Sequence, residues 1–222
     1  MAGIIKAESY HIQAYKYIQK SLLEKKYKPG EQITEVGLAN ELEISRGPIR
    51  EAMRMLMQDG LFVQNGSRTF VFNPSYQDAL DLYLCKERLE PLAAKLAAKN
   101  IDEDGKMELS NMLDKIENSV ANEQPVEEIT TYNTEFNDLI LTFSKNDQLI
   151  HFMNLIRSKT IYMRNALLGE VNRRDVFLEE YRAITAAINQ NDDCLAEQLM
   201  IKHVEVDLEM LKQYFENATE EE

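Results

Sequence analysis

The sequence predicts a mainly α-helical protein of two domains, with three helices and one β-hairpin followed by an all-α bundle of six helices. Apolar residues recur at helical spacing through most of the chain, and a single strand–turn–strand pattern surrounds Asn65-Gly66. The hairpin pattern stops at Asn73-Pro74-Ser75, where a helix-only pattern begins. The 222 residues are also enough for two domains of ordinary size.

The N-terminal elements follow one another closely. Apolar residues predict a first helix over residues 8–25, which Lys28-Pro29-Gly30 ends. Thr34 can cap a short second helix that reaches Leu42, and Ser45 can cap a third over residues 46–58. Residues 61–64 and 67–72 alternate as strands on either side of an Asn65-Gly66 turn.

Six helices are predicted in the second part of the chain. Their ranges are 76–99, 106–121, 126–144, 147–168, 174–190 and 193–216. We therefore divide the chain into a first domain over residues 1–73, a linker over 74–77, a second domain over 78–217 and a solvated acidic tail over 218–222.

Composition excludes several classes of protein. No apolar stretch is long enough to be a signal peptide or to cross a bilayer, so we expect a cytoplasmic protein that does not bind membranes. Cys85 and Cys194 lie far apart in helical patterns, which predicts buried, reduced thiols and no disulfide or metal cluster. Residues 1–73 carry 10 basic and 8 acidic side chains, and the acidity behind the net charge of −13 belongs to the second domain. A polyanion can approach the first domain.

The first domain has the order of a winged helix-turn-helix, whose second short helix can enter the major groove of DNA. At 100° per residue, the third predicted helix has two distinct sides. Arginines form one flank: Arg46, Arg50 and Arg54. Apolar residues form another: Ile49, Ala52, Met53 and Leu56. The sequence therefore predicts that this helix packs through one side and contacts double-stranded DNA through the other.

Particular residues suit particular contacts with DNA. Ser45 and the start of the third helix can hold a phosphate, and Arg46 or Arg50 can bind a guanine edge through two hydrogen bonds. Gly47 lets the backbone approach closely. The wing tip offers a small polar loop: Asn65, Gly66, Ser67 and Arg68. The alternative is a helix-turn-helix that contacts protein, with solvated arginines, and the row of arginines argues against it.

The segment from Ile33 to Leu61 resembles the GntR family of bacterial regulators. It contains Ser45-Arg46-Gly47-Pro48-Ile49-Arg50-Glu51-Ala52, which follows the family pattern Ser-Arg-x-Pro-x-Arg-Glu-Ala. The resemblance implies that Arg46 and Arg50 read the groove and that Gly66 is the wing-tip glycine. Glu43 departs from the family, which usually has glycine in the turn between these helices, and it places an acid near the phosphates.

The second domain resembles the FadR-like branch, in its shorter, VanR-like form with six helices. The resemblance rests on Arg88 to Ala98, Phe136-Asn137, Tyr181 to Ile188, and the spacing of Ala196, Met200 and His203. It implies a domain that binds a small-molecule effector and joins two protomers.

Many members of that branch hold a divalent metal ion through an aspartate and three histidines. The matching positions here are Asn133, Asn137, Tyr181 and His203. Neutral amides and a phenol are poor ligands for such a metal, so we expect no metal or other cofactor. The four side chains either line an effector pocket or form an internal polar network with water. Arg88 is a further candidate for binding an effector carboxylate, although Glu90 could occupy it.

Together these observations predict a sequence-specific transcription regulator, most simply a repressor, that binds a palindromic operator as a homodimer. One winged helix offers few base contacts, which favours a dimer. An enzyme built on the helical bundle is the alternative. No serine or cysteine has an evident base and no Gly-rich phosphate loop is present, so the sequence does not favour it.

Overall fold

The fold was analysed in a computed structural model, which describes residues 8–163 and 174–220. The chain splits into two compact units, Met1–Ser75 with Ile156–Ala166, and Tyr76–Leu155 with Leu167–Glu222. Within the two described stretches, no helix is long and apolar enough to cross a membrane.

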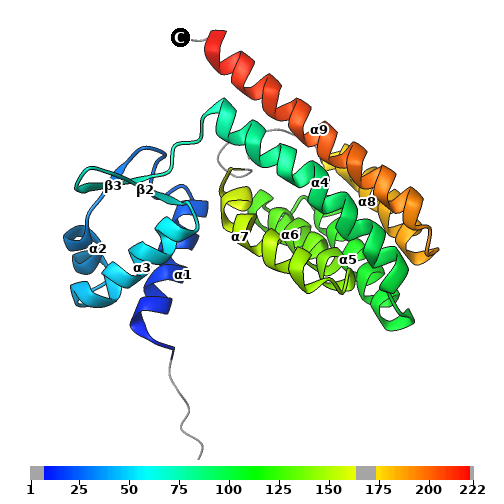
Figure 1. The fold of residues 1–222 in the computed structure, drawn as a ribbon, viewed down its shortest axis with the longest axis horizontal. Coiled ribbons are helices and arrows are strands. Elements are labelled where there is room, and N and C mark those ends of the chain that lie inside the picture. The colour runs from blue at the N-terminus through cyan, green and yellow to red at the C-terminus, as the bar shows by residue number, and fades with distance from the viewer. Residues whose placement is uncertain (1–7, 164–173, 221–222) are drawn as a thin grey trace, which may run out of the picture. The chain divides into compact units, whose positions relative to one another are not determined.

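The first unit contains three helices and a small antiparallel sheet (Figure 1). The helices are α1 (Tyr10–Leu23), α2 (Glu35–Glu41) and α3 (Arg46–Gln58). The strands are β1 (Gln32–Ile33), β2 (Phe62–Asn65) and β3 (Arg68–Val71), in the order β1-β3-β2. This is the predicted winged helix-turn-helix. Strand β1 was not predicted, because two residues are too few to display an alternating pattern.

The hairpin turn lies one residue later than the sequence predicted. Asn65 pairs with Arg68 across the two strands, so the two-residue loop consists of Gly66 and Ser67. Gly66 has a φ of 60°, and Asn65 is not among the residues with positive φ. Such a loop needs glycine at its first central position, and Gly66 supplies it only in this register.

The core of the first unit forms where α1 and α3 pack together. The predicted apolar flank of α3 is confirmed, because Ile49, Ala52, Met53 and Leu56 are all buried. From α1, Ile18 is fully buried, and α1 packs on α3. The side of α3 that carries the arginines is thereby left for solvent.

Helices are the only regular secondary structure among the described residues of the second unit. Its helices are α4 (Tyr76–Asn100), α5 (Glu103–Ala121), α6 (Val126–Phe143), α7 (Asp147–Met163), α8 (Arg174–Asn189) and α9 (Asp193–Glu220), and the last turns of α7 group with the first unit. Figure 1 shows α9, in orange to red, running beside α4, and these two helices share the most extensive packing in the unit.

Several predicted boundaries shift. Helix α4 begins at Tyr76, as predicted for the helix, although the predicted linker overlapped its first two residues. Helix α9 continues to Glu220, through most of the predicted tail. The predicted extension of α7 over residues 164–168 lies outside the described residues. Helix α5 begins three residues early, because Asp102 caps it by accepting a hydrogen bond of 2.9 Å from the Gly105 amide.

Small residues allow the helices of the bundle to approach closely. Ala94, Ala97 and Ala98 of α4 are fully buried within the main apolar cluster. Gly105 lies in the first turn of α5, where an added Cβ would come within 2.9 Å of Ile101 and 3.0 Å of Phe143. Larger side chains at these positions would push neighbouring elements apart.

The two cysteines differ from their prediction. Cys85 and Cys194 are both free thiols, but both are exposed and not buried. Cys85 follows Leu84 on the outer side of α4, and 48% of Leu84 is accessible to solvent. Apolar composition alone does not reveal which side of a long helix faces the core.

Candidate nucleic-acid interface and effector site

The arginine-bearing side of α3 is built by its own helical repeat. Arg46, Arg50 and Arg54 are spaced four residues apart and all three are exposed. Ser45 precedes the helix in an extended conformation, and its side chain makes no capping hydrogen bond. The start of α3 therefore presents a hydroxyl, backbone N–H groups and a row of guanidinium groups to solvent.

Two of the three arginines hold ion pairs. Arg50 donates from Nε and Nη2 to the two carboxylate oxygens of Glu35, at 2.9 and 3.0 Å. Arg54 donates one hydrogen bond of 2.8 Å to Glu51, on its own helix. The hydrogen bonds from Arg50 hold the pKa of the Glu35 carboxyl below its usual range, and the same pair raises the pKa of Arg50.

Glycines shape the rest of this surface. A Cβ built on Gly47 or on Gly66 would meet no atom within 4 Å, so both backbones are open to an approaching partner. At the wing tip, Asn65 and Arg68 are exposed beside Gly66. These predicted DNA contacts thus lie in two places, at the start of α3 and at the tip of the β2–β3 hairpin.

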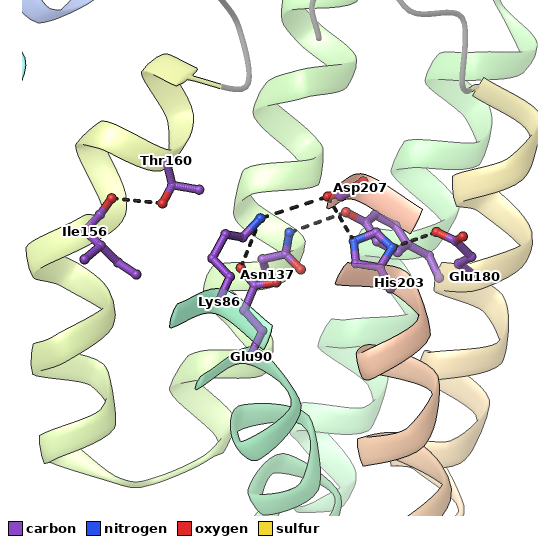
Figure 2. A network of polar contacts seen from close by, with 9 residues as sticks. Lys86, Glu90, Asn137, Ile156, Thr160, Glu180, His203 and Asp207 are labelled. Atoms are coloured by element: carbon purple, nitrogen blue, oxygen red, sulfur yellow. Dashed lines mark hydrogen bonds and ion pairs between the residues drawn. The ribbon is translucent and has the colours of Figure 1, made fainter. Parts of the chain in front are cut away.

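The second unit brings together polar side chains from four helices (Figure 2). The His203 ring on α9 places its Nδ1 2.7 Å from Oε2 of Glu180 on α8, and its Nε2 lies 4.0 Å from Oδ2 of Asp207. Lys86 on α4 lies 3.6 Å from Glu90 and 4.0 Å from the same oxygen of Asp207. His203, Lys86 and Asp207 are all buried.

The predicted residues on α6 and α8 join this cluster. Asn137 donates a hydrogen bond of 3.4 Å to the Tyr181 hydroxyl, whose ring lies 5.3 Å from that of His203. The Tyr181 ring also stacks on Phe136, with 4.3 Å between centroids. One turn before Asn137, the carboxamide oxygen of Asn133 is buried and accepts no hydrogen bond from any residue that the structure describes.

Arg88 lies apart from this cluster. Its side chain is 78% exposed, and its guanidinium lies 3.7 Å from Glu87, not from Glu90. The lysine two residues earlier occupies the inward position instead, with its ammonium 4.3 Å from the centroid of the buried Tyr83 ring. Arg88 and Lys86 differ by about 200° around the helix, so they face nearly opposite sides.

Sequence reasoning missed the charged members of the cluster. Lys86 with Glu90, and His203 with Asp207, are both separated by one helical turn, which is a usable signal. Pairs with this spacing are also common on solvent-exposed helix faces. Only burial, which the sequence does not show, distinguishes these two pairs from surface pairs. The hydroxyl of Tyr83 is a further member that the sequence did not indicate; it is buried and has no hydrogen-bond partner among the described residues.

The side chains at the family's metal positions do not fit a divalent metal ion. Two are neutral carboxamides, and one of these donates its N–H to the Tyr181 hydroxyl. A protonated phenol such as the third one is a weak ligand for such a metal. Nδ1 of His203 faces Glu180, and no group of three or more His, Cys, Asp or Glu side chains in the described residues is arranged to hold a metal.

Comparisons with known families identify both units. Residues 12–71 match the family of bacterial regulatory proteins, gntR family. Residues 81–206 match the FCD domain. These two ranges contain α3, the wing and every described member of the polar cluster except Asp207, which lies one residue beyond the second range.

Curated relatives and solved structures agree with these matches. The chain is 30% identical to the HTH-type transcriptional regulator YdhC of Bacillus subtilis, over 97% of this chain and 96% of that protein. It is 21% identical to the HTH-type transcriptional repressor GlaR of Escherichia coli, over 91% and 96% of the two chains. Among solved structures, McbR/YncC of E. coli has a TM-score of 0.80 at 21% identity, over 94% of this chain and all of that one.

A second structure, a GntR regulator from Rhodococcus, has a TM-score of 0.76 at 18% identity and covers 93% of this chain and 99% of that one. Both structural likenesses concern the fold. The family is shown by the domain matches and by the relative that is 30% identical over nearly the full length. This protein therefore belongs to the GntR family of transcription regulators, with an N-terminal winged helix-turn-helix and a C-terminal FCD effector domain.

Proposed function

We propose that this regulator acts in the cytoplasm, where it binds a palindromic operator in double-stranded DNA as a homodimer and represses transcription until an effector releases it. The observation that carries the proposal is the exposed row of Arg46, Arg50 and Arg54 on α3, which lies away from a buried apolar flank. A helix held in this way can enter the major groove without unpacking.

The DNA contacts divide into two kinds. Arg46 and Arg50 read base edges, since each guanidinium can donate two hydrogen bonds to one guanine. Ser45 and the N-terminus of α3 bind a phosphate, and Gly47 allows that approach. Arg54 and the wing residues Asn65, Gly66 and Arg68 add contacts to the backbone or minor groove. Phosphate contacts strengthen binding to every sequence, whereas base contacts discriminate between sequences.

The test begins with operators selected by the full-length protein from a library of random DNA duplexes. We expect Arg46→Ala to weaken binding to the selected operator about tenfold or more and to relax the preference at one base pair. Arg68→Ala should weaken binding evenly across sequences. Unchanged operator affinity in the Arg46→Ala/Arg50→Ala double variant, with its circular dichroism intact, would rule out the proposed recognition helix.

The helical unit offers a surface for dimerisation. Large apolar side chains are exposed on α4, at Leu84 (48%) and Leu92 (38%), and on α7, at Phe152 (52%) and Leu155 (61%). Burying such side chains at a two-fold interface would remove them from water.

We expect sedimentation of the intact chain to give a dimer at micromolar concentration, and a Leu84→Glu/Leu92→Glu variant to give a monomer. Met107→Glu, which changes a 60% exposed methionine on α5, is the matched control and should remain dimeric.

The effector site works without a metal or another cofactor. Asn133, Asn137, Tyr181 and His203 supply amide, hydroxyl and imidazole groups, which suit an uncharged or weakly acidic small molecule. The buried, unpaired oxygen of Asn133 supports this assignment, because such an atom gains from a ligand that donates a hydrogen bond. Effector binding would favour one of two arrangements of the dimer, and thereby change its affinity for DNA. Arg88 would take part only if its side chain turned inward.

Elemental analysis of protein purified without chelator tests the absence of a metal, together with calorimetry using zinc, nickel and manganese. We expect no stoichiometric metal and no binding at micromolar concentration. About one metal ion per chain, lost in His203→Ala, would contradict the proposal.

Mass spectrometry of small molecules that copurify with the folded protein then identifies the effector. The identified molecule should bind more weakly to Asn133→Ala and should alter operator affinity.

A further inference from the structure

Glu35 connects α2 to the arginine row of α3. It is the first residue of α2, immediately after Thr34, whose hydroxyl caps this helix by accepting a hydrogen bond of 3.0 Å from the Gly37 amide. From this position the two oxygens of the Glu35 carboxylate accept from Nε and Nη2 of Arg50, at 2.9 and 3.0 Å. The contact joins residues 15 positions apart, so it depends on the packing of the two helices.

The pair uses only one edge of the guanidinium. An arginine has five N–H groups, and Glu35 takes the Nε–H and one N–H of Nη2. The two N–H groups of Nη1 and the second one of Nη2 are left for the end of the fork. That end can donate two parallel hydrogen bonds to O6 and N7 of a guanine. The ion pair and the base contact are therefore compatible.

We infer that Glu35 is a positioning residue for Arg50, holding its guanidinium so that the free end of the fork faces the major groove. This inference rests on the proposed DNA-binding function. The side chain of Arg50 is 54% exposed, and without an anchor it would lose rotamer freedom each time it bound a base. The ion pair with Glu35 pre-organises the guanidinium for one base. Binding to a different base at that position therefore loses more affinity.

The electrostatics of the pair favour the same arrangement. The Glu35 carboxylate stands at the N-terminus of α2, where the helix dipole stabilises a negative charge. Hydrogen bonds from Arg50, and the nearby charges of Arg46 and Arg54, keep its pKa below the usual range. Glu35 is therefore charged at the pH of the cytoplasm. The contact stays in place without a change of protonation.

The other two arginines provide a built-in comparison. Arg54 makes a single hydrogen bond, to Glu51 three residues earlier on the same helix. Arg46 forms no ion pair with another residue that the structure describes. Arg50 is thus distinguished within this row by a two-point anchor on another helix. Glu51→Gln is a matched control, since it neutralises an acid on α3 that pairs with an arginine outside the predicted base contacts.

The experiment measures discrimination between base pairs, in the full-length protein and on an operator selected from random duplexes. The relevant base pair is the one at which Arg50→Ala relaxes the preference for guanine, which should fall about tenfold or more. At that base pair we expect Glu35→Gln and Glu35→Ala to lower discrimination about threefold or more. Their affinity for random-sequence DNA should be unchanged or slightly higher, because a negative charge is lost. Glu51→Gln should leave discrimination at that base pair unchanged.

A double-mutant cycle separates positioning from a general effect of charge. If Glu35 acts through Arg50, Glu35→Gln has no further effect on discrimination in the Arg50→Ala background. Unchanged or sharper discrimination in the single Glu35→Gln variant would overturn the inference and identify Glu35 as a competitor of the DNA. Failure of the wild-type protein to select any sequence would instead refute the proposed function itself.

Discussion

Glu43 lies in the turn between α2 and α3, and it has a φ of 54°. This left-handed conformation brings the Cβ of an ordinary residue close to the backbone, whereas glycine adopts it without that penalty. The family usually has glycine at this turn. The chain therefore combines the family's backbone with a side chain that strains it.

We expect Glu43→Gly to stabilise the protein against unfolding by about 1 kcal/mol, because it relieves the left-handed strain. Glu43→Ala also removes the carboxylate but keeps a Cβ, so it should give little or no gain. Urea denaturation of the three proteins measures the difference. An equal gain in the glycine and alanine variants over the wild type would show that the charge matters and the backbone conformation does not, and no gain in the glycine variant would contradict the strain.

At the scale of elements, α4 shows how closely packed the helical unit is. Its buried alanines lie in the main apolar cluster, while Leu84, Cys85 and Arg88 occupy its outer side. A helix with small residues on its inner face allows its neighbours to approach, and α9 packs along it. The same helix thereby contributes to the core, to the polar cluster through Lys86, and to the proposed dimer surface.

Ala97→Leu tests this close packing. Ala97 is fully buried, and the added carbon atoms must displace neighbouring side chains or backbone. We expect a loss of about 1–3 kcal/mol in the free energy of unfolding. Ala186→Leu makes the same change at an exposed position of α8 and should be nearly neutral. If Ala97→Leu leaves the free energy of unfolding unchanged, α4 is not closely packed against its neighbours at this position.

The start of α5 makes stability depend on pH. The backbone hydrogen bond from Gly105 to the Asp102 carboxylate lowers the pKa of this cap, and the Lys145 ammonium 3.7 Å away acts in the same direction. A carboxyl whose pKa is lower in the folded protein stabilises it above the unfolded pKa of about 3.9, and this contribution disappears as the pH falls through the folded value.

Asp102→Asn keeps an oxygen that can accept the capping hydrogen bond, but it cannot titrate. Urea midpoints measured from pH 6 to pH 3 should therefore fall more steeply for the wild type than for this variant. Parallel curves for the two proteins would indicate that the charge of Asp102 does not contribute.

On the scale of the whole molecule, charge is divided between the two parts of the chain. Residues 1–73 have a net charge of +2, whereas the full chain has −13. DNA is attracted to the first unit and repelled by most of the remaining surface, which restricts the orientations in which the two can meet.

The salt dependence of DNA binding measures how many phosphates the first unit contacts. Each phosphate neutralised by a basic side chain contributes about −0.9 to the slope of log affinity against log salt. Arg68→Ala should reduce the magnitude of this slope by about one for each bound protomer. Arg88→Ala removes an exposed arginine from the second unit and should leave the slope unchanged. Equal slopes for the wild type and Arg68→Ala would show that Arg68 at the wing tip does not contact a phosphate.

The sequence by itself determined the order and type of nearly all elements and the two sides of α3, because helical periodicity, caps and turn residues act over a few positions of the chain. The family resemblance also indicated Asn137, Tyr181 and His203 as candidate site residues, and the structure shows that their side chains lie in one cluster. Short-range patterns could not determine the pairing of β1, the register of the hairpin or the exposure of the cysteines.

Only the tertiary structure decided which charged residues belong to the two candidate sites. Glu35 reaches Arg50, and Lys86 reaches Asp207, only because separate helices pack at particular rotations and heights. A shift of one residue rotates a side chain by 100° about its helix, so contacts between helices depend on the packing of the whole core. Arg88 and Lys86 illustrate this dependence: two residues apart on α4, one is 78% exposed and the other is buried.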